Sequence, residues 1–163
     1  MLLAIGLAVG ITDALVVDTI KGAVGRPRPH DMVAGVRTLD LARAKPRFLS
    51  ITKPLQEEIS VAKIRGAAGN SFPSGHASNN FAVAAVVFCF YRRWGWVAFL
   101  PAALVSYSRI YVGAHWPLDV LTSCLIGAGI GFLVVALLEV LWRRWAGRVA
   151  PRFSAQHPSL LAA

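Results

Sequence analysis

Three short polar segments interrupt an otherwise apolar sequence, and their residue types could bind and act on an anion. The first is KGAVGRPRP at 21–29, the second is PSGH at 73–76, and the third is SRIYVGAHWPLD at 108–119. Together they contain lysine, arginine, serine, two histidines and one aspartate. Arginine binds oxyanions through two N–H groups, and lysine adds a point charge. We therefore expect the three segments to form one site for a group with several negative charges, such as a phosphate.

The second segment has the composition of a helix start that binds an anion. Ser74 could cap the following helix, and Gly75 permits close approach of the backbone. The N-terminus of a helix presents free N–H groups and the positive end of the helix dipole. His76 would lie in the first turn and face whatever binds there. Capping alone would explain Ser74 but would give no reason for His76.

The third segment places His115 and Asp119 four residues apart, a spacing that a helix brings to one face. A carboxylate bonded to one imidazole nitrogen fixes the tautomer and leaves the other nitrogen free to attack or to accept a proton. Arg109 lies six residues before His115. The alternative is an ordinary charged pair at a helix start. With His76, the set indicates covalent phosphoryl transfer, in which one histidine attacks and the other protonates the leaving oxygen.

Metal binding is the other chemistry that this residue set could support. The two histidines and Asp119 could act as ligands, but Lys21, Arg28 and Arg109 nearby would repel a cation. We therefore expect charge neutralisation by side-chain cations in place of Mg²⁺, with no metal and no other cofactor.

The segments that must position these residues are long and apolar. Hydrophobic residues make up 56% of the 163-residue chain and charged residues only 15%, and the mean hydropathy is +0.57. Four stretches, 1–20, 75–91, 95–113 and 117–142, approach the ~20 residues that a membrane span requires. We predict an all-α integral membrane bundle of about four transmembrane helices. Alternating helix directions would place the three polar segments at the same end. The alternative is a soluble all-α protein with buried helices.

The net charge of +9 is unevenly distributed and suggests an orientation. Arginines follow the second and fourth apolar stretches, at 92–93 and within 143–152, and short basic flanks of this kind favour the cytoplasmic side. The long connection at 21–74 is then extracytoplasmic. No nucleic-acid-binding motif accompanies the basic residues, so we expect no nucleic-acid partner.

Other features divide the chain further. We expect a membrane domain at 1–145, with an extracytoplasmic loop at 30–72, and a flexible cytoplasmic tail at 146–163. Within the loop, ITKPLQEEISVAKI (51–64) has an amphipathic look and could lie along the membrane interface, or could be a solvated loop with a helical turn.

Two pairs of glycines have the spacing that permits close contact between helices. The pairs are Gly6 with Gly10 and Gly127 with Gly131, each four residues apart. Without side chains, such positions let two helix backbones approach each other. We expect packing inside the bundle at both pairs, and the alternative is contact between two copies of the chain in a dimer.

The three segments resemble the motifs of the type 2 phosphatidic acid phosphatase family. That family's pattern is Lys, six residues, Arg-Pro; then Pro-Ser-Gly-His; then Ser-Arg, five residues, His, three residues, Asp. Here the matching positions run from Lys21 to Arg28, across PSGH at 73–76, and from Arg109 to His115 and Asp119. The resemblance extends over residues 1 to about 142 and excludes the tail.

The resemblance implies a role for each matching residue. His115 would become phosphohistidine, with Asp119 orienting it, and His76 would first protonate the leaving group and then activate water. The phosphate oxygens would be held by Lys21, Arg28, Ser74, the Gly75 amide and Arg109. Members of this family are similar in needing no metal.

The resemblance also implies a substrate class and a location. The substrate would be a membrane lipid phosphate: undecaprenyl pyrophosphate, phosphatidylglycerol phosphate, phosphatidic acid or a phosphate of lipid A. We expect a multi-pass protein of the bacterial cytoplasmic (inner) membrane with its site on the periplasmic side. Bacterial relatives typically have two helices before the lysine motif, and this chain has room for four helices in all. The oligomeric state stays open.

Two other functions are compatible with this pattern. A vanadium-dependent haloperoxidase uses a similar pocket to hold vanadate, with the residue equivalent to His115 as ligand. A non-catalytic lipid-binding membrane subunit would keep its biological activity without His115.

Overall fold

The computed structural model describes residues 1–41, 54–61 and 69–161 and consists mainly of helices. The helical elements are α1 (Leu2–Gly10), the π-helix η1 (Ile11–Val17), α2 (Asp18–Val24), α3 (Pro29–Met32), α4 (Gly75–Phe90), the 3-10 helix η3 (Gly95–Ala98), α5 (Phe99–Tyr111), α6 (Pro117–Val149) and α7 (Pro151–Gln156). The strands are β1 (Arg37–Leu41) and β2 (Leu55–Ile59). The expectation of an all-α helical bundle is confirmed, with one small hairpin added.

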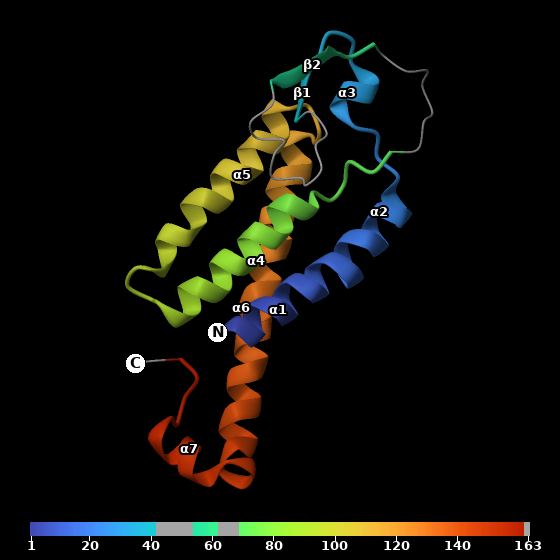
Figure 1. The fold of residues 1–163 in the computed structure, drawn as a ribbon. Coiled ribbons are helices and arrows are strands. Elements are labelled where there is room, and N and C mark those ends of the chain that lie inside the picture. Colours follow the sequence, from blue (N-terminus) through green and yellow to red (C-terminus); the bar gives the residue numbers. More distant parts are fainter. Residues whose placement is uncertain (42–53, 62–68, 162–163) are drawn as a thin grey trace.

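The bundle is organised around α4, which contacts α1, α5 and α6 (Figure 1). Gly127 and Gly131 of α6 face the backbone of α4, where a methyl group on either glycine would overlap the carbonyl oxygen of Ser78 or Ala82. The close contact expected at this glycine pair is therefore confirmed. The expectation of packing inside the bundle at Gly6 and Gly10 is wrong for the described part of the chain, where no atom of another segment lies within 4 Å of a side-chain carbon built at either position.

Helices occupy all four stretches that were expected to span a membrane. Two stretches, Leu2–Met32 and Pro117–Val149, are long and apolar enough to cross a bilayer by length and composition. The helix α4 has 16 residues and α5 has 13, which is shorter than the ~20 residues of a full span. The third expected span is divided, because η3 precedes α5 and continues into it as a different helix type.

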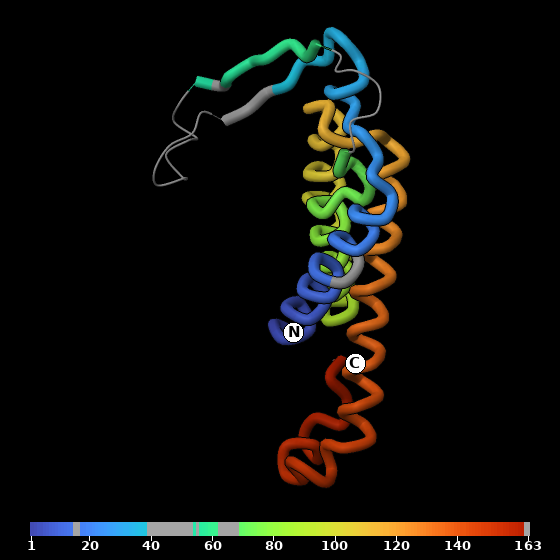
Figure 2. The backbone as a smooth tube through the Cα atoms, turned by 90° about the vertical axis from the view of Figure 1, so that its right-hand side faces the viewer, coloured from blue at the N-terminus to red at the C-terminus, as the bar shows by residue number. Residues whose placement is uncertain are grey.

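The hairpin projects away from the bundle at the end where α6 begins (Figure 2). β1 and β2 are antiparallel, with Arg37 opposite Ile59 and an ion pair between Arg37 and Glu57. The helical turn considered within 51–64 is therefore wrong for Leu55–Ile59, which pairs as a strand, whereas a location along the membrane interface stays a prediction. Residues 51–53 and 62–64 lie outside the described part of the chain.

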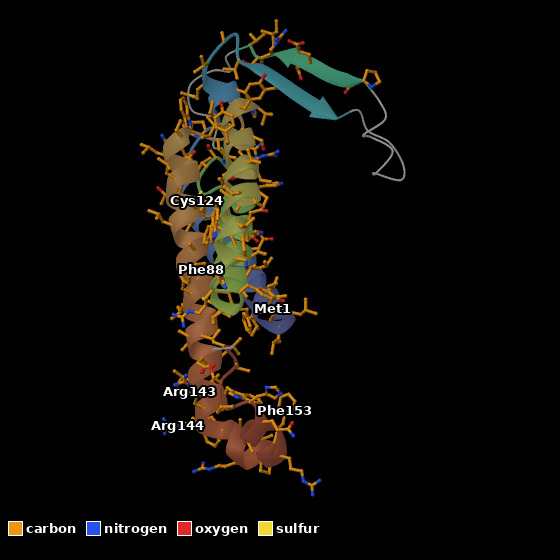
Figure 3. All side chains as sticks on the ribbon, turned by 90° about the vertical axis from the view of Figure 1, so that its left-hand side faces the viewer. Met1, Phe88, Cys124, Arg143, Arg144 and Phe153 are labelled. Atoms are coloured by element: carbon orange, nitrogen blue, oxygen red, sulfur yellow. The ribbon has the colours of Figure 1, made fainter. Side chains whose placement is uncertain are left out.

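The opposite end of the molecule is formed by the end of α6 and by α7, where Figure 3 labels Arg143 and Phe153. Residues 146–149, expected in a flexible tail, continue α6, and the chain then turns through α7. The indole Nε1 of Trp142 donates to the carbonyl of His157 at 2.8 Å. The cytoplasmic location of this segment stays a prediction.

Candidate active site

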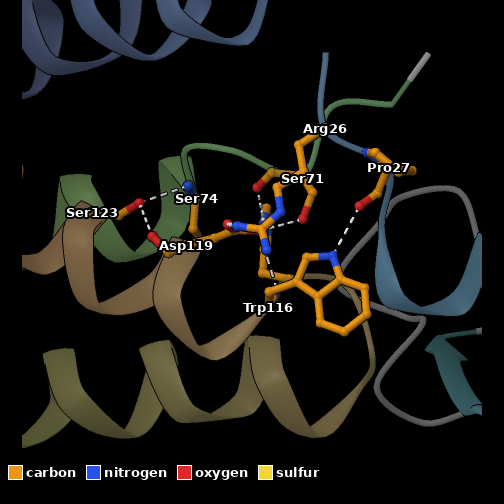
Figure 4. Close-up of polar contacts among 8 residues, drawn as sticks. Arg26, Pro27, Ser71, Ser74, Trp116, Asp119 and Ser123 are labelled. Atoms are coloured by element: carbon orange, nitrogen blue, oxygen red, sulfur yellow. Dashed lines mark hydrogen bonds and ion pairs between the residues drawn. The ribbon is translucent and has the colours of Figure 1, made fainter. Parts of the chain in front are cut away.

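The three polar segments meet at the end of the bundle where α2 ends and α4 and α6 begin. Ser71 N donates to the carbonyl of Arg26 at 2.8 Å, and the indole Nε1 of Trp116 donates to the carbonyl of Pro27 at 3.0 Å (Figure 4). A side-chain carbon built at Gly75 would lie 4.0 Å from the Lys21 Nζ. Residues almost a hundred positions apart in the sequence thus form one site.

The imidazole of His115 is held in a defined tautomer. His115 is 6% exposed, and its Nδ1 lies 2.5 Å from the carbonyl oxygen of Ser71. A carbonyl oxygen only accepts hydrogen bonds, so Nδ1 carries the hydrogen and Nε2 keeps its lone pair. Nε2 is therefore the nitrogen available to attack an electrophile.

Burial lowers the pKa of His115 from its usual value of 6.5 and favours the neutral imidazole. The hydrogen bond to Ser71 opposes this effect and raises the pKa, as does the charge of Asp119, whereas the charges of Arg28 and Lys21 lower it. Because the lowering causes prevail, the neutral, nucleophilic form persists below pH 6.5.

Asp119 is buried and does not contact His115 in the way that the sequence suggested. Its Oδ1 lies 2.5 Å from the Arg26 NH1, and its Oδ2 accepts hydrogen bonds from Ser71 Oγ at 2.5 Å and from Trp116 N at 3.2 Å. In the described part of the chain no hydrogen bond joins the carboxylate to the imidazole, because Nδ1 of His115 is occupied by Ser71. The connection between the two residues runs through Ser71.

The start of α4 is attached to α6 by a serine pair. Ser74 N donates to Ser123 Oγ at 2.7 Å, and that hydroxyl donates to the carbonyl of Asp119 at 2.5 Å. The Ser74 side chain makes no capping hydrogen bond, so the capping interpretation is wrong, and its buried Oγ has no partner among the described residues. An unpartnered buried hydroxyl at a helix start is an incomplete polar site that an anion could complete.

His76 follows on the first turn of α4 and is exposed. Arg109, Lys21 and Asp13 lie close enough for their charges to act on its imidazole. His76 therefore shares its surroundings with two of the cations expected to hold phosphate, while His115 shares Lys21 and Arg28. The two histidines thus flank a common group of positive charges.

The three cations expected to bind phosphate are half-buried and lack acidic partners in the described part of the chain. Lys21, Arg28 and Arg109 form no ion pair with a described carboxylate. The Arg109 guanidinium instead donates to Ser108 Oγ, from Nε at 3.2 Å and from NH2 at 3.1 Å. Uncompensated positive charge gathered at a helix start favours binding of an anion. The described residues include no group of three or more His, Cys, Asp or Glu that could hold a metal ion.

A pocket of about 410 Å³ with mainly apolar walls adjoins His115. Val36, Ile110, Tyr111 and Trp116 are among its lining residues. The site therefore combines a charged group of side chains with neighbouring apolar surface.

Sequence reasoning missed Arg26, Ser71 and Ser123. Arg26 lies in the first polar segment, but nothing in the sequence distinguishes the arginine that pairs with a carboxylate from Arg28, two residues later. Ser71 acts through a backbone carbonyl as well as its hydroxyl, and a carbonyl has no signature in residue types. Ser123 is one turn after Asp119, a position that could have been examined as its neighbour on α6.

The chain is similar to known lipid phosphatases over much of its length. The PAP2 superfamily model matches residues 1–143. An undecaprenyl-diphosphatase of Sulfolobus acidocaldarius is 46% identical over 68 residues, which cover 41% of this chain and 33% of that protein. The undecaprenyl-diphosphatase BcrC of Bacillus subtilis is 37% identical over 75 residues, which cover 46% of this chain and 39% of that protein.

A lipid A 4'-phosphatase of Bacteroides thetaiotaomicron is 28% identical over 143 residues, which cover 86% of this chain and 55% of that protein. These matches span between a third and just over half of the relatives' lengths. No solved structure gave a significant match. The three motifs, their meeting at one end of a helical bundle, and the family match over residues 1–143 lead to one conclusion: the chain belongs to the PAP2 superfamily.

Proposed function

We propose that this protein hydrolyses a phosphomonoester or pyrophosphate of a membrane lipid through a phosphohistidine intermediate. The observation that carries the proposal is a group of three cations, Lys21, Arg28 and Arg109, that have no ion-pair partner among the described residues and lie beside two histidines. The named relatives act on undecaprenyl diphosphate and lipid A, which supports a lipid substrate. Undecaprenyl pyrophosphate, phosphatidylglycerol phosphate, phosphatidic acid and lipid A phosphates are the candidates.

In the first step the neutral His115 attacks phosphorus. Lys21, Arg28 and Arg109 neutralise the phosphate oxygens, with the Ser74 hydroxyl and the Gly75 amide as hydrogen-bond donors. A bond forms from His115 Nε2 to phosphorus as the bond from phosphorus to the leaving oxygen breaks; this is the ester oxygen of a phosphomonoester or the bridging oxygen of a pyrophosphate. His76 gives its proton to that leaving oxygen.

In the second step water releases the phosphate. The neutral His76 takes a proton from a water molecule, whose oxygen attacks the phosphorus of the phosphohistidine. The bond to Nε2 breaks, so inorganic phosphate leaves and both histidines return to their starting forms. Positioning and charge neutralisation by the chain's own side chains supply most of the rate acceleration in this type of reaction.

The apolar surfaces support a location in the bacterial cytoplasmic membrane. Leu2–Met32 and Pro117–Val149 could each cross the bilayer, and the pocket beside His115 provides apolar contact for a lipid. The arginines at 92–93 and 143–152 lie at the other end from the site and favour the cytoplasm. The site would then face the periplasm.

The test is release of inorganic phosphate from a panel of the four candidate lipids by the purified protein in detergent. His115→Ala should lower kcat by roughly 1,000-fold or more on the lipid that the wild type hydrolyses, because the nucleophile is lost. His157→Ala is the matched control, since it removes a histidine at the far end of the chain, and it should retain wild-type activity. Activity should also persist in excess EDTA.

Three outcomes would contradict the proposal. The first is hydrolysis that survives His115→Ala. The second is loss of activity in EDTA with recovery on adding Mg²⁺ or Zn²⁺. The third is no lipid hydrolysis together with bromide oxidation in vanadate and peroxide, which would support a haloperoxidase.

A further inference from the structure

Arg26, Ser71 and Asp119 are joined to one another in a closed ring of polar contacts, and the Ser71 carbonyl of this ring contacts His115. Ser71 N donates to the Arg26 carbonyl at 2.8 Å, and Ser71 Oγ donates to Asp119 Oδ2 at 2.5 Å. The ring closes where the Arg26 NH1 lies 2.5 Å from Asp119 Oδ1 (Figure 4). The members come from three parts of the chain: the segment after α2, the segment before α4, and the first turn of α6.

We propose that this Arg26–Ser71–Asp119 ring is a positioning device for the nucleophile. It immobilises the Ser71 carbonyl, which holds the hydrogen of His115 on Nδ1 and directs the lone pair of Nε2 toward phosphorus. The inference rests on the function proposed above. Arg26 and Ser71 act through His115 and are positioning residues.

The hydrogen bonds of the ring restrict the movement of the Ser71 carbonyl. The backbone N–H and the hydroxyl of Ser71 are both engaged, one by Arg26 and the other by Asp119. Ser71 and Asp119 are fully buried, so water cannot replace a lost partner. An unsatisfied buried group costs about 1–3 kcal/mol, and the cost is larger for a charged group.

The Arg26 guanidinium is itself fixed from outside the ring. It lies 5.7 Å from the centroid of the Trp116 ring, at the distance of a cation–π contact. The indole of Trp116 is held in turn by its bond to the Pro27 carbonyl at 3.0 Å. Arg26 is therefore oriented toward Asp119 before any substrate binds.

The ring could instead serve only to join three segments of the fold, and the two roles differ in what they do to His115. The charges that face His115 are those of Arg28, Asp119 and Lys21. Losing Arg26 would leave the carboxylate of Asp119 uncompensated, and this negative charge would favour the imidazolium of His115. That electrostatic shift follows from the lost charge in either role, whereas a change in the tautomer of His115 is expected only if the ring positions the imidazole through the Ser71 carbonyl.

The kinetic test compares Ser71→Ala, Arg26→Lys and Arg26→Met with wild type from pH 4 to 9. The substrate is undecaprenyl pyrophosphate, or whichever panel lipid the wild type hydrolyses fastest. Ser71→Ala should lower kcat about 10- to 100-fold, the effect of one hydrogen bond to a charged group, with KM nearly unchanged. Arg26→Met should also move the acid limb of kcat to higher pH, and Arg26→Lys should restore part of both losses.

Arg148→Met is the matched control. It removes another arginine that lies over a tryptophan, 5.2 Å from the ring of Trp145, at the other end of the molecule. It should leave kcat, KM and the acid limb unchanged. Two results would overturn the proposal. The first is an equal loss of kcat in the ring variants and in the control, with no shift of the acid limb. The second is a rise in KM alone.

A measurement without substrate separates this proposal from the function on which it rests. The chain has four histidines, so 15N NMR of histidine-labelled protein can follow His115, assigned with His115→Gln. The wild type should show the Nδ1–H tautomer, and Ser71→Ala and Arg26→Met should show a mixture of tautomers. If the wild type hydrolyses no panel lipid, the proposed function fails. The NMR result still shows whether the ring positions the imidazole of His115. Unchanged spectra in both variants would refute the positioning role of the ring, whatever the activity of the protein.

Discussion

Two buried carboxylates on α6 have the same kinds of partner but occupy opposite ends of the molecule. Asp119, near the start of the helix, accepts hydrogen bonds from an arginine, a serine hydroxyl and a backbone N–H. Glu139, near its other end, also accepts from an arginine (Arg143), a serine hydroxyl (Ser159) and a backbone N–H (Leu160). Each set satisfies a charge that would be costly to bury alone.

The two carboxylates differ in how far away in the sequence their partners lie. Asp119 is joined to residues 93 and 48 positions away, and one of these, Ser71, also contacts His115. Glu139 is joined to residues 4, 20 and 21 positions away, and the latter two, Ser159 and Leu160, attach the C-terminal segment to α6. Similar hydrogen-bonding groups thus fix the surroundings of His115 at one end and hold the C-terminal segment against α6 at the other.

The largest difference is expected when each carboxylate is replaced by its amide. Asp119→Asn should lower kcat for lipid phosphate release by about 100-fold, because the ring that fixes the Ser71 carbonyl loses its charged acceptor. Glu139→Gln should stay within about twofold of wild type, because no part of its network reaches a histidine of the site. Comparable kcat losses in the two variants, measured on protein of equal stability, would contradict the difference in role between the two networks.

A smaller effect is expected from changing the contact that holds α6 against α4 between the two carboxylates. Gly127→Ala should lower the free energy of unfolding by about 1–3 kcal/mol, because the added methyl group would overlap the backbone carbonyl of Ser78. Gly129→Ala is the control, since a side-chain carbon there has no neighbour within 4 Å and should leave stability unchanged or slightly raised. The measurement is thermal unfolding in detergent. Equal melting temperatures for the two variants would contradict the close approach of the helices.

The smallest expected effect is a shift of the acid limb of the pH–rate profile. Burial lowers the pKa of His115 below 6.5, so the wild type should lose activity only as the pH falls through that lowered value. The charge of Asp119 raises this pKa, so Asp119→Asn should move the acid limb to still lower pH, opposite in direction to Arg26→Met. Glu139→Gln should not move it. A common shift in both amide variants would mean that the two ends of α6 are not electrostatically distinct.

Much of the fold and the meeting of the polar segments could be predicted from the sequence. Apolar stretches mark helices because each must bury its backbone polar groups internally, and alternating directions bring every second junction to the same end. That reasoning places Lys21, His76 and His115 together without any knowledge of side-chain geometry. The spacing of the family motifs then identifies the same positions.

The details that decide the chemistry could not be predicted in this way. The i, i+4 spacing of His115 and Asp119 is compatible with a direct bond, but a backbone carbonyl at Ser71 takes that position, and carbonyls are present at every residue. Likewise, Gly6 with Gly10 and Gly127 with Gly131 have identical spacing, yet among the described residues only the second pair lies against the backbone of another helix. The spacing of two residues shows only that they lie on the same face of one helix. Whether that face contacts another helix depends on how the rest of the chain folds.

The close approach of α4 and α6 at Gly127 also limits how a long hydrocarbon could be accommodated. Two backbones this near each other leave no channel between them for an isoprenoid or acyl tail. On the proposed function, the tail would stay outside this helix pair, among the surrounding lipids, while the charged headgroup alone enters the bundle. Discrimination between substrates would then depend on the headgroup, and tails of different length would be handled alike.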